Sequence, residues 1–272
     1  MVPEEQEQQA AVSSSRRPTF PPEQESLFRE VIELMERHRV PFAISGAFAL
    51  HEHTGIWRDT KDLDLFLPAG DVAHALQLLE SDGFATDIPD PVWLAKARRD
   101  GYYVDLITGM SNAVVRVDRS WIERARRANI FGSSARVLAP EELIASKVFV
   151  TRRERFDGAD ICHVIHGTRG QFDWQRLLDL LSEHWQMLYW YLVLYHYVYP
   201  GDAGYVPGEI WKELQQRFQI ELAHPNKVTD FRGSLIDEYM FNIDVAEWGK
   251  RDILEEYRRT AALIRRGPSE AA

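Results

Sequence analysis

The chain is poor in cysteine, in long apolar runs and in net positive charge. Cys162 is the only cysteine among 272 residues, which excludes an internal disulfide and fits a reducing compartment. The longest aromatic and apolar stretch, 187–198, is well short of the ~20 residues that span a bilayer. The acidic N-terminus lacks a secretion-signal pattern. We therefore expect a cytoplasmic protein without a membrane partner, and the net charge of −10 argues against a broad, nonspecific grip on nucleic acid.

The spacing of apolar residues divides the chain into three parts. Residues 1–22 are rich in Gln, Glu, Ser and Pro, which indicates a disordered tail. Between 23 and 167 helices and strands are predicted to alternate, as helix 23–39, strand 42–45, helix 47–52, strand 62–67, helix 71–81 and hairpin strands 93–99 and 102–107. From 168 to 272 helices are predicted at 173–184, 185–199, 207–223 and 245–264. The expected fold class is α+β, a mixed sheet flanked by helices and followed by a C-terminal helical domain.

The run Asp62-Leu63-Asp64-Leu65-Phe66 is the most informative pattern in the chain. Residues i and i+2 of a strand point to the same face, so Asp62 and Asp64 converge on one spot. Two ionised carboxylates repel each other unless a cation lies between them, and Mg²⁺ binds through one or two carboxylates plus substrate phosphates. The pattern predicts a divalent-metal site, against the plainer interpretation of a solvated strand face.

A turn of small residues, Ser45-Gly46-Ala47, precedes this pair and opens a predicted helix. A strand, a glycine turn and a helix N-terminus together turn backbone N–H groups toward a phosphate. The spaced pattern Ser45-Gly46-Ala47…Arg58-x-Thr60-x-Asp62-Leu63-Asp64 resembles the first motif of the DNA polymerase β-like nucleotidyltransferases, above all their small AbiEii-like and minimal members. The resemblance covers roughly 42–165.

This resemblance implies a nucleotidyltransferase domain over 23–167, a nucleoside triphosphate such as ATP as substrate, and Mg²⁺ or Mn²⁺ as cofactor. It assigns nucleotide contacts to residues of the turn and of the segment before the strand: Ser45, Gly46, Ala47, Arg58 and Thr60. The family usually has two consecutive small residues in the turn. Here the pair is either Ser45-Gly46 or Gly46-Ala47, and the second alternative lacks the phosphate-facing hydroxyl.

The superfamily has a third acid on a neighbouring strand, and Asp105 lies in a predicted strand among apolar residues. The dipeptide Asp100-Gly101 before it is a strong hairpin signal, because both central positions of a type I′ turn need positive φ. By resemblance, Asp105 ligates metal with Asp62 and Asp64 and takes the proton of an incoming hydroxyl. The structural alternative is an acid paired with Lys96 or Arg98 across the hairpin.

A second cluster begins at Pro140, which starts a predicted helix with two acids in its first turn. Lys147, followed by Arg152, Arg153 or Arg155 and then by Asp157-Gly158-Ala159-Asp160, resembles the family's later motifs. By resemblance, Lys147 contacts the triphosphate and Asp160 holds that lysine or an arginine in place. Spacing alone shows that the two aspartates share a helix face, and the other interpretation is an exposed, salt-bridged helix pair.

Positive charge is concentrated near these motifs. Residues 96–155 contain 13 Lys and Arg against 7 Asp and Glu. Such a patch steers a nucleoside triphosphate, or an RNA end, toward a metal site. A solvated helix over 121–129 would explain half of it equally well, so charge does not choose the acceptor.

The resulting hypothesis is a metal-dependent enzyme that moves a nucleotidyl group from a triphosphate to an acceptor hydroxyl and releases pyrophosphate. A tRNA end or a protein side chain is the favoured acceptor, as in toxin–antitoxin relatives, and a small molecule such as an antibiotic is the alternative. A competing hypothesis is a non-catalytic nucleotide-binding or antitoxin-like protein with a protein partner. The imperfect small-residue turn favours the latter.

Overall fold

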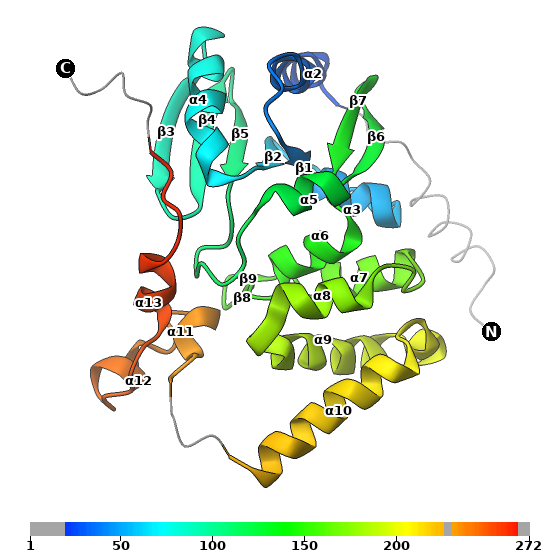
Figure 1. Ribbon diagram of the computed structural model, residues 1–272. Coiled ribbons are helices and arrows are strands. Elements are labelled where there is room, and N and C mark those ends of the chain that lie inside the picture. The colour runs from blue at the N-terminus through cyan, green and yellow to red at the C-terminus, as the bar shows by residue number, and fades with distance from the viewer. Residues whose placement is uncertain (1–19, 226–229, 266–272) are drawn as a thin grey trace.

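A seven-stranded mixed sheet of order β3-β4-β5-β2-β1-β7-β6 forms the upper part of the protein in Figure 1. The computed structural model describes residues 20–225 and 230–265. Residues 1–19 of the predicted tail 1–22 lie outside the described residues, and the last residue of that prediction, Pro22, is the first residue of α2. β2 is parallel to β5 and β1 is parallel to β7, whereas the other neighbours are antiparallel. The strands are β1 (Ala43–Ile44), β2 (Asp62–Phe66), β3 (Ala85–Asp90), β4 (Leu94–Arg99), β5 (Tyr102–Ile107), β6 (Arg126–Ile130), β7 (Ser133–Val137) and, in a separate pair, β8 (Thr151–Arg152) and β9 (Arg155–Phe156).

Helices flank this sheet and form the lower part of the molecule, which confirms the predicted fold class (Figure 1). α2 and α4 pack on each other and on strands, while α6 packs on α7 and α8, and these two helices pack on α9. The α-helices are α2 (Pro22–Arg37), α3 (Gly46–Thr54), α4 (Val72–Ser81), α5 (Arg119–Arg124), α6 (Pro140–Lys147), α7 (Gly158–Gly167), α8 (Trp174–Leu181), α9 (Trp185–Val198), α10 (Gly208–Ala223), α11 (Gly233–Ile236), α12 (Asn242–Ala246) and α13 (Leu254–Arg259). The 3₁₀ helices are η1 (Ala69–Asp71), η2 (Ser182–His184) and η3 (Pro200–Tyr205).

Local patterns account for the elements nearest the site. α2 begins with proline at its first position and buries the apolar stripe that includes Phe28, Val31 and Ile32. The β4–β5 hairpin turns at Asp100 and Gly101, whose φ values of 53° and 82° confirm the predicted type I′ geometry. Strand pairing in this hairpin therefore has a register set by its turn.

Two helix predictions are wrong. Over 121–129 the structure has the end of α5 and then β6, because the backbone turns extended at Ala125 and the following residues pair with β7. Over 245–264 it has the end of α12, a break at Gly249 with φ of 64°, and the short helix α13. The arginines of the 119–127 segment consequently lie on a short helix and an edge strand instead of one solvated helix.

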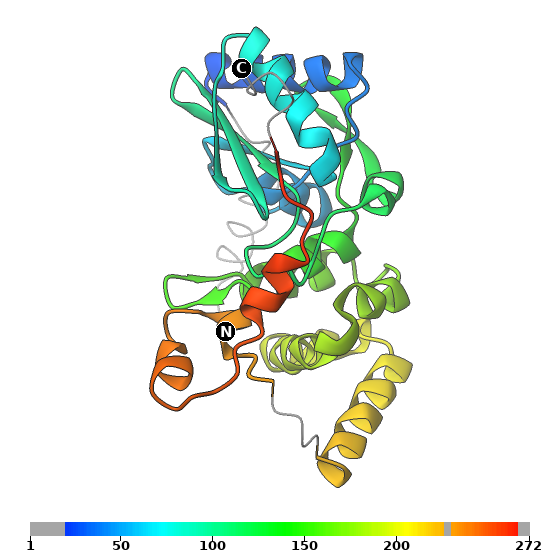
Figure 2. The ribbon, with the colours of Figure 1, turned by 60° about the vertical axis from the view of Figure 1, so that its left-hand side comes forward.

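The C-terminal segment returns to the sheet domain (Figure 2). Ile264 donates its N–H to the Pro91 carbonyl at 2.7 Å, and Arg258 forms an ion pair with Asp90 at 2.9 Å. Asn112 Nδ2 donates to the Leu235 carbonyl at 2.8 Å, so α11 also contacts the segment that follows β5. The last part of the chain thus contacts both the end of β3 with the turn that follows it and the segment after β5.

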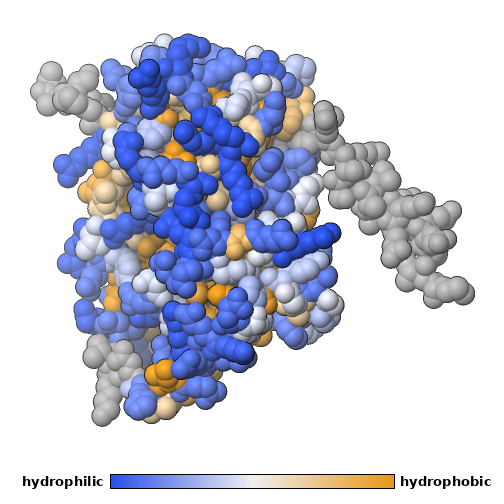
Figure 3. All heavy atoms as spheres, turned by 45° about the vertical axis from the view of Figure 1, so that its right-hand side comes forward, coloured by the Kyte–Doolittle hydropathy of each residue, from blue (hydrophilic) through white to orange (hydrophobic). Residues whose placement is uncertain are grey.

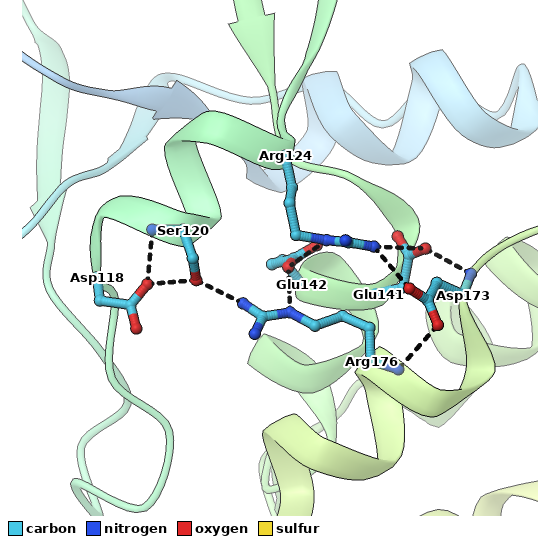
Figure 4. A network of polar contacts seen from close by, with 7 residues as sticks. All are labelled: Asp118, Ser120, Arg124, Glu141, Glu142, Asp173 and Arg176. Carbon is cyan, nitrogen blue, oxygen red and sulfur yellow. Dashed lines mark hydrogen bonds and ion pairs between the residues drawn. The ribbon is translucent and has the colours of Figure 1, made fainter.

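A buried charge network joins α5, α6 and α8 (Figure 4). The Glu142 side chain is fully buried and pairs with Arg176 at 3.0 Å and with Arg124 at 3.6 Å. Glu141 accepts the backbone N–H of Asp173 at 2.6 Å. These contacts fix the first turn of α6, whose last residue, Lys147, reaches the cavity described below.

The face in Figure 3 is mainly hydrophilic, with separate apolar patches between the polar side chains. On α9, Trp185, Tyr191 and Tyr195 are buried in the core, whereas Trp190 and Tyr197 are exposed. Among the described residues, no helix combines the length and the apolar character needed to cross a bilayer.

Candidate active site

A cavity of about 470 Å³ opens between the sheet and the helices below it. Its lining includes every residue that the sequence predicted for the site, namely Ser45, Gly46, Ala47, Arg58, Thr60, Asp62, Asp64, Asp105, Lys147 and Asp160. They come from segments far apart in the chain: the start of α3, the segment before β2, β2 itself, β5, the end of α6 and the first turn of α7. The fold therefore brings the whole predicted set together.

The two β2 acids face this cavity from one side of the strand. Asp62 and Asp64 are less buried than Leu63 and Leu65, which lie between and after them in the core. Asp64 is the register partner of Asp105 on β5, so these two carboxylates lie side by side on the same face. Alternate residues of β2 thus have different roles: the leucines pack in the core and the aspartates face the cavity.

Asp64 has an unfavourable environment for a negative charge. Burial, followed by the nearby carboxylates of Asp105 and Asp62, raises the pKa of Asp64 to about 6. No Lys or Arg hydrogen-bonds or ion-pairs with the Asp62 or Asp64 side chain within residues 20–225 and 230–265. The pair has the charge imbalance that a bound cation relieves.

Gly46 lets the backbone approach Asp64 closely. It begins α3 with φ of 58°, and a Cβ there would lie 1.8 Å from Asp64 Oδ2. Ser45 is buried at the N-cap, and its N–H donates to the Asp64 carbonyl at 2.9 Å. The helix N-terminus and the β2 carboxylates are therefore held against each other, as the predicted turn requires.

Replacing Gly46 with alanine is expected to lower the thermal midpoint and to reduce turnover roughly tenfold to a hundredfold. A left-handed alanine costs about 1–2 kcal/mol, and the added Cβ displaces the Asp64 carboxylate. Thermal unfolding and steady-state kinetics measure the two effects. Gly83→Ala is the matched control, because Gly83 has φ of 86° with nothing near its missing Cβ. Equal turnover in both variants would contradict the proposed role of this close approach.

Asp105 is paired with Lys96, the structural alternative left open by the sequence. Lys96 Nζ lies 2.8 Å from each Asp105 carboxylate oxygen, and the two residues are register partners across the β4–β5 hairpin. Burial raises the pKa of Asp105, and the bonds from Lys96 work against that rise. Asp105 lines the cavity and is also a salt-bridged acid, so both features hold at once.

The cavity lining also includes a cluster of charged residues around Lys147. Lys147 Nζ donates to Asp157 Oδ2 and Asp160 Oδ2, both at 2.8 Å. Arg58 contacts Asp160 at 2.6 Å and Arg155 contacts Asp157 at 3.0 Å. Burial tends to raise the pKa of Asp157, but the bonds from Arg155 and Lys147 prevail and hold it below its usual range.

This cluster differs from the exposed helix pair that the sequence also allowed. Asp157 and Asp160 are buried, and Arg152 and Arg155 belong to the β8–β9 hairpin instead of a helix. The lysine has three donors and uses two of them on the acids, so one remains for an anion in the cavity.

The segment before β2 is held by the start of α2. Gln24 is buried and donates from Nε2 to the Thr60 carbonyl at 2.6 Å. Phe20 packs edge-on against Trp57 with ring centroids 4.9 Å apart. Sequence reasoning missed both contacts, because Gln24 appears only as a polar position on an amphipathic helix.

The acids fit one divalent ion better than two. In the described part of the chain, no group of three or more His, Cys, Asp or Glu side chains is placed to hold a metal ion. Asp62 and Asp64 together supply the one or two carboxylates that Mg²⁺ takes when phosphates complete its shell. Both oxygens of Asp105 already accept hydrogen bonds from Lys96.

Comparisons with known proteins give one match in sequence and several in structure. A family model described as "Uncharacterised nucleotidyltransferase" matches residues 24–199, well over half of the chain. No curated protein sequence matches.

Three solved structures are examples of the structural matches. JHP933 from Helicobacter pylori is 16% identical with a TM-score of 0.39, and the match covers 76% of this chain and 100% of that chain. ANT(2")-Ia in complex with adenylyl-2"-tobramycin is 15% identical with a TM-score of 0.42, and the match covers 59% and 95%. Lincomycin-bound LnuA, a lincosamide antibiotic adenylyltransferase, is 15% identical with a TM-score of 0.39, and the match covers 54% and 98%. Likenesses this weak carry no argument about function.

Proposed function

Because this chain belongs to the nucleotidyltransferase family matched over residues 24–199, we propose that it transfers a nucleotidyl group from a triphosphate to an acceptor hydroxyl. The observation that carries the proposal is one cavity whose lining combines the paired carboxylates of Asp62 and Asp64 with the cluster of Lys147, Arg58 and Arg155. A triphosphate and a hard cation need these two kinds of group within a few ångströms of each other.

In this proposal Asp62 and Asp64 hold Mg²⁺ or Mn²⁺. Their crowding, which raises the pKa of Asp64 to about 6, is relieved when a divalent ion neutralises both charges. The bound ion supplies charge neutralisation on the reacting phosphates. The third ligand role predicted for Asp105 competes with its bonds to Lys96.

The remaining cavity residues bind and orient the phosphates. The backbone N–H groups of Gly46 and Ala47 begin α3 at the cavity, which Ser45 also lines, and Lys147 keeps one donor free. Arg58 and Arg155 line the same cavity with partly exposed side chains. Thr60 Oγ1 accepts a hydrogen bond from the Asp62 N–H at 3.0 Å. Asp160 anchors both Lys147 and Arg58.

The transfer step then needs a base near the acceptor. The acceptor oxygen attacks the α-phosphorus, the bond from that phosphorus to the bridging oxygen breaks, and pyrophosphate leaves with the bond electrons. Asp105 accepts the hydroxyl proton on a lone pair that does not face Lys96. Positioning and electrostatics supply most of the rate.

The acceptor that we propose is a tRNA end or a protein side chain, in keeping with the AbiEii-like resemblance of the Arg58-x-Thr60-x-Asp62-Leu63-Asp64 pattern and a toxin–antitoxin role. Incubation of the protein with α-³²P-labelled triphosphates, Mg²⁺ and total cell extract tests both the transfer reaction and the identity of its acceptor. Asp62→Ala/Asp64→Ala is the inactive control. We expect label on RNA or polypeptide with the wild type alone. Label on a small molecule would show that the acceptor is a small molecule and not RNA or protein. Tight nucleotide binding without labelled product would support the non-catalytic alternative.

A further inference from the structure

Four charged residues form a row across one face of the sheet, the face on which Asp64 and Asp105 line the cavity. Asp87 on β3 is the register partner of Lys96 on β4, Lys96 is the partner of Asp105 on β5, and Asp105 is the partner of Asp64 on β2. Directly opposite residues on neighbouring strands point to the same face, so the row reads acid, base, acid, acid. Lys96 therefore lies on the strand between those of Asp87 and Asp105, and its ion pair is with Asp105.

Lys96 is tightly placed in this row. Its ammonium bonds both oxygens of Asp105 at 2.8 Å and lies 5.9 Å from the centre of the Tyr103 ring. The Asp105 side chain is only 14% exposed, so little water competes for it. By contrast, the side chains of Asp62 and Asp64 have no such cation among the described residues.

We propose that the Lys96 ammonium is a built-in cation that occupies the place beside Asp105 where a second divalent ion would bind. The protein would then take one divalent ion per chain, at Asp62 and Asp64. An ion at Asp105 would have to displace two hydrogen bonds and approach a fixed positive charge. This inference rests on the proposed function only in that it assumes a metal at the β2 pair.

The assignment makes Lys96 a positioning residue. Its two hydrogen bonds fix the orientation of the Asp105 carboxylate and occupy the side of that acid where a metal ion would approach. It also agrees with the absence of a three-ligand group in residues 20–225 and 230–265.

Manganese titration followed by electron paramagnetic resonance of free Mn²⁺ tests this inference on the full-length chain without nucleotide. We expect one Mn²⁺ per chain for the wild type and for the control Lys212→Met, since Lys212 lies on α10 and does not line the cavity. Lys96→Met is expected to bind two, and Lys96→Met/Asp105→Asn is expected to return to one. If Lys96→Met does not fold, Lys96→Gln removes the charge and keeps a donor.

Two ions bound by the wild type, with one lost in Asp105→Asn, would overturn the inference, and so would a single ion in both Lys96 variants. The labelled-transfer assay on the wild type is read separately. Absence of transfer with one Mn²⁺ per chain removes the proposed function and leaves the role of Lys96 standing, whereas transfer with two ions does the reverse.

Discussion

Asp64→Asn is expected to lower nucleotidyl transfer by roughly a thousandfold or more and, at the same time, to stabilise the folded protein. Loss of a preorganised charge at a reacting phosphate costs about two to three orders of magnitude, and here the metal ligand is lost as well. Asparagine has the same shape as aspartate, so packing around Gly46 is kept. The variant therefore separates the chemistry of the carboxylate from its size.

The stabilisation follows from the raised pKa of Asp64. A carboxyl with a pKa near 3.8 when unfolded and about 6 when folded binds more protons in the folded state between these values. The metal-free protein consequently loses stability as pH rises through that window, by roughly 3 kcal/mol in total. The Asp64→Asn side chain carries no such charge, so the gain is expected above pH 6 and absent near pH 4.

Urea unfolding at several pH values, with and without Mg²⁺, measures this effect beside the transfer assay. Asp100→Asn is the matched control, because Asp100 lies at the tip of the β4–β5 hairpin and asparagine tolerates its positive φ. The control should keep activity and show no such pH-dependent gain. An active Asp64→Asn would remove Asp64 from the metal site, and an Asp64→Asn that is less stable than the wild type at pH 7 without Mg²⁺ would contradict the crowding of the carboxylates.

Arg176→Met is expected to destabilise the protein by roughly 3–5 kcal/mol, the usual cost of leaving a buried charge without its partner. Glu142 is fully buried, and Arg176 donates from Nε to it at 3.0 Å while its other end reaches Ser120 Oγ at 2.8 Å (Figure 4). Burial already raises the pKa of Glu142, and Arg176 is the group that opposes this rise most. The variant should accordingly be least stable at high pH, where Glu142 must ionise.

Denaturant midpoints for Arg176→Met and for Glu142→Leu/Arg176→Met measure the loss. The double variant removes both charges and is expected to recover much of the stability, because apolar residues of similar volume replace a buried pair at little cost. Arg217→Met, which breaks a partly exposed ion pair with Glu213 within α10, should stay within about 0.5 kcal/mol of the wild type. A single variant as stable as the wild type would mean that Arg124 alone satisfies Glu142.

Short-range patterns predicted the parts of the site that depend on neighbours in sequence. The two-residue period placed Asp62 and Asp64 on one face, and Asp100-Gly101 gave the hairpin that brings Asp105 beside them. The helix that ends at Lys147 followed from its proline and its first-turn acids. All three depend on rules that act within a few residues.

Long-range contacts were beyond these rules. The sequence left the Lys96 pair as one of two alternatives, since pairing partners on a hairpin depend on register and on what else faces the cavity. The edge strand β3 carries Pro89 and has no fully buried side, so its pattern resembles a loop. The helix predicted over 245–264 failed because contacts with Pro91 and Asp90 decide the path of that segment.

The way the C-terminal segment reaches back has a consequence for synthesis of the protein. Ser111 and Asn112 line the cavity, and they are held by Arg258 and by the Leu235 carbonyl. A ribosome adds about 5–20 residues each second. Several seconds therefore pass between synthesis of the cavity acids and Lys147 and synthesis of Arg258. The pocket wall is therefore completed only after the segment around Arg258 has left the exit tunnel, long after the acids themselves have emerged.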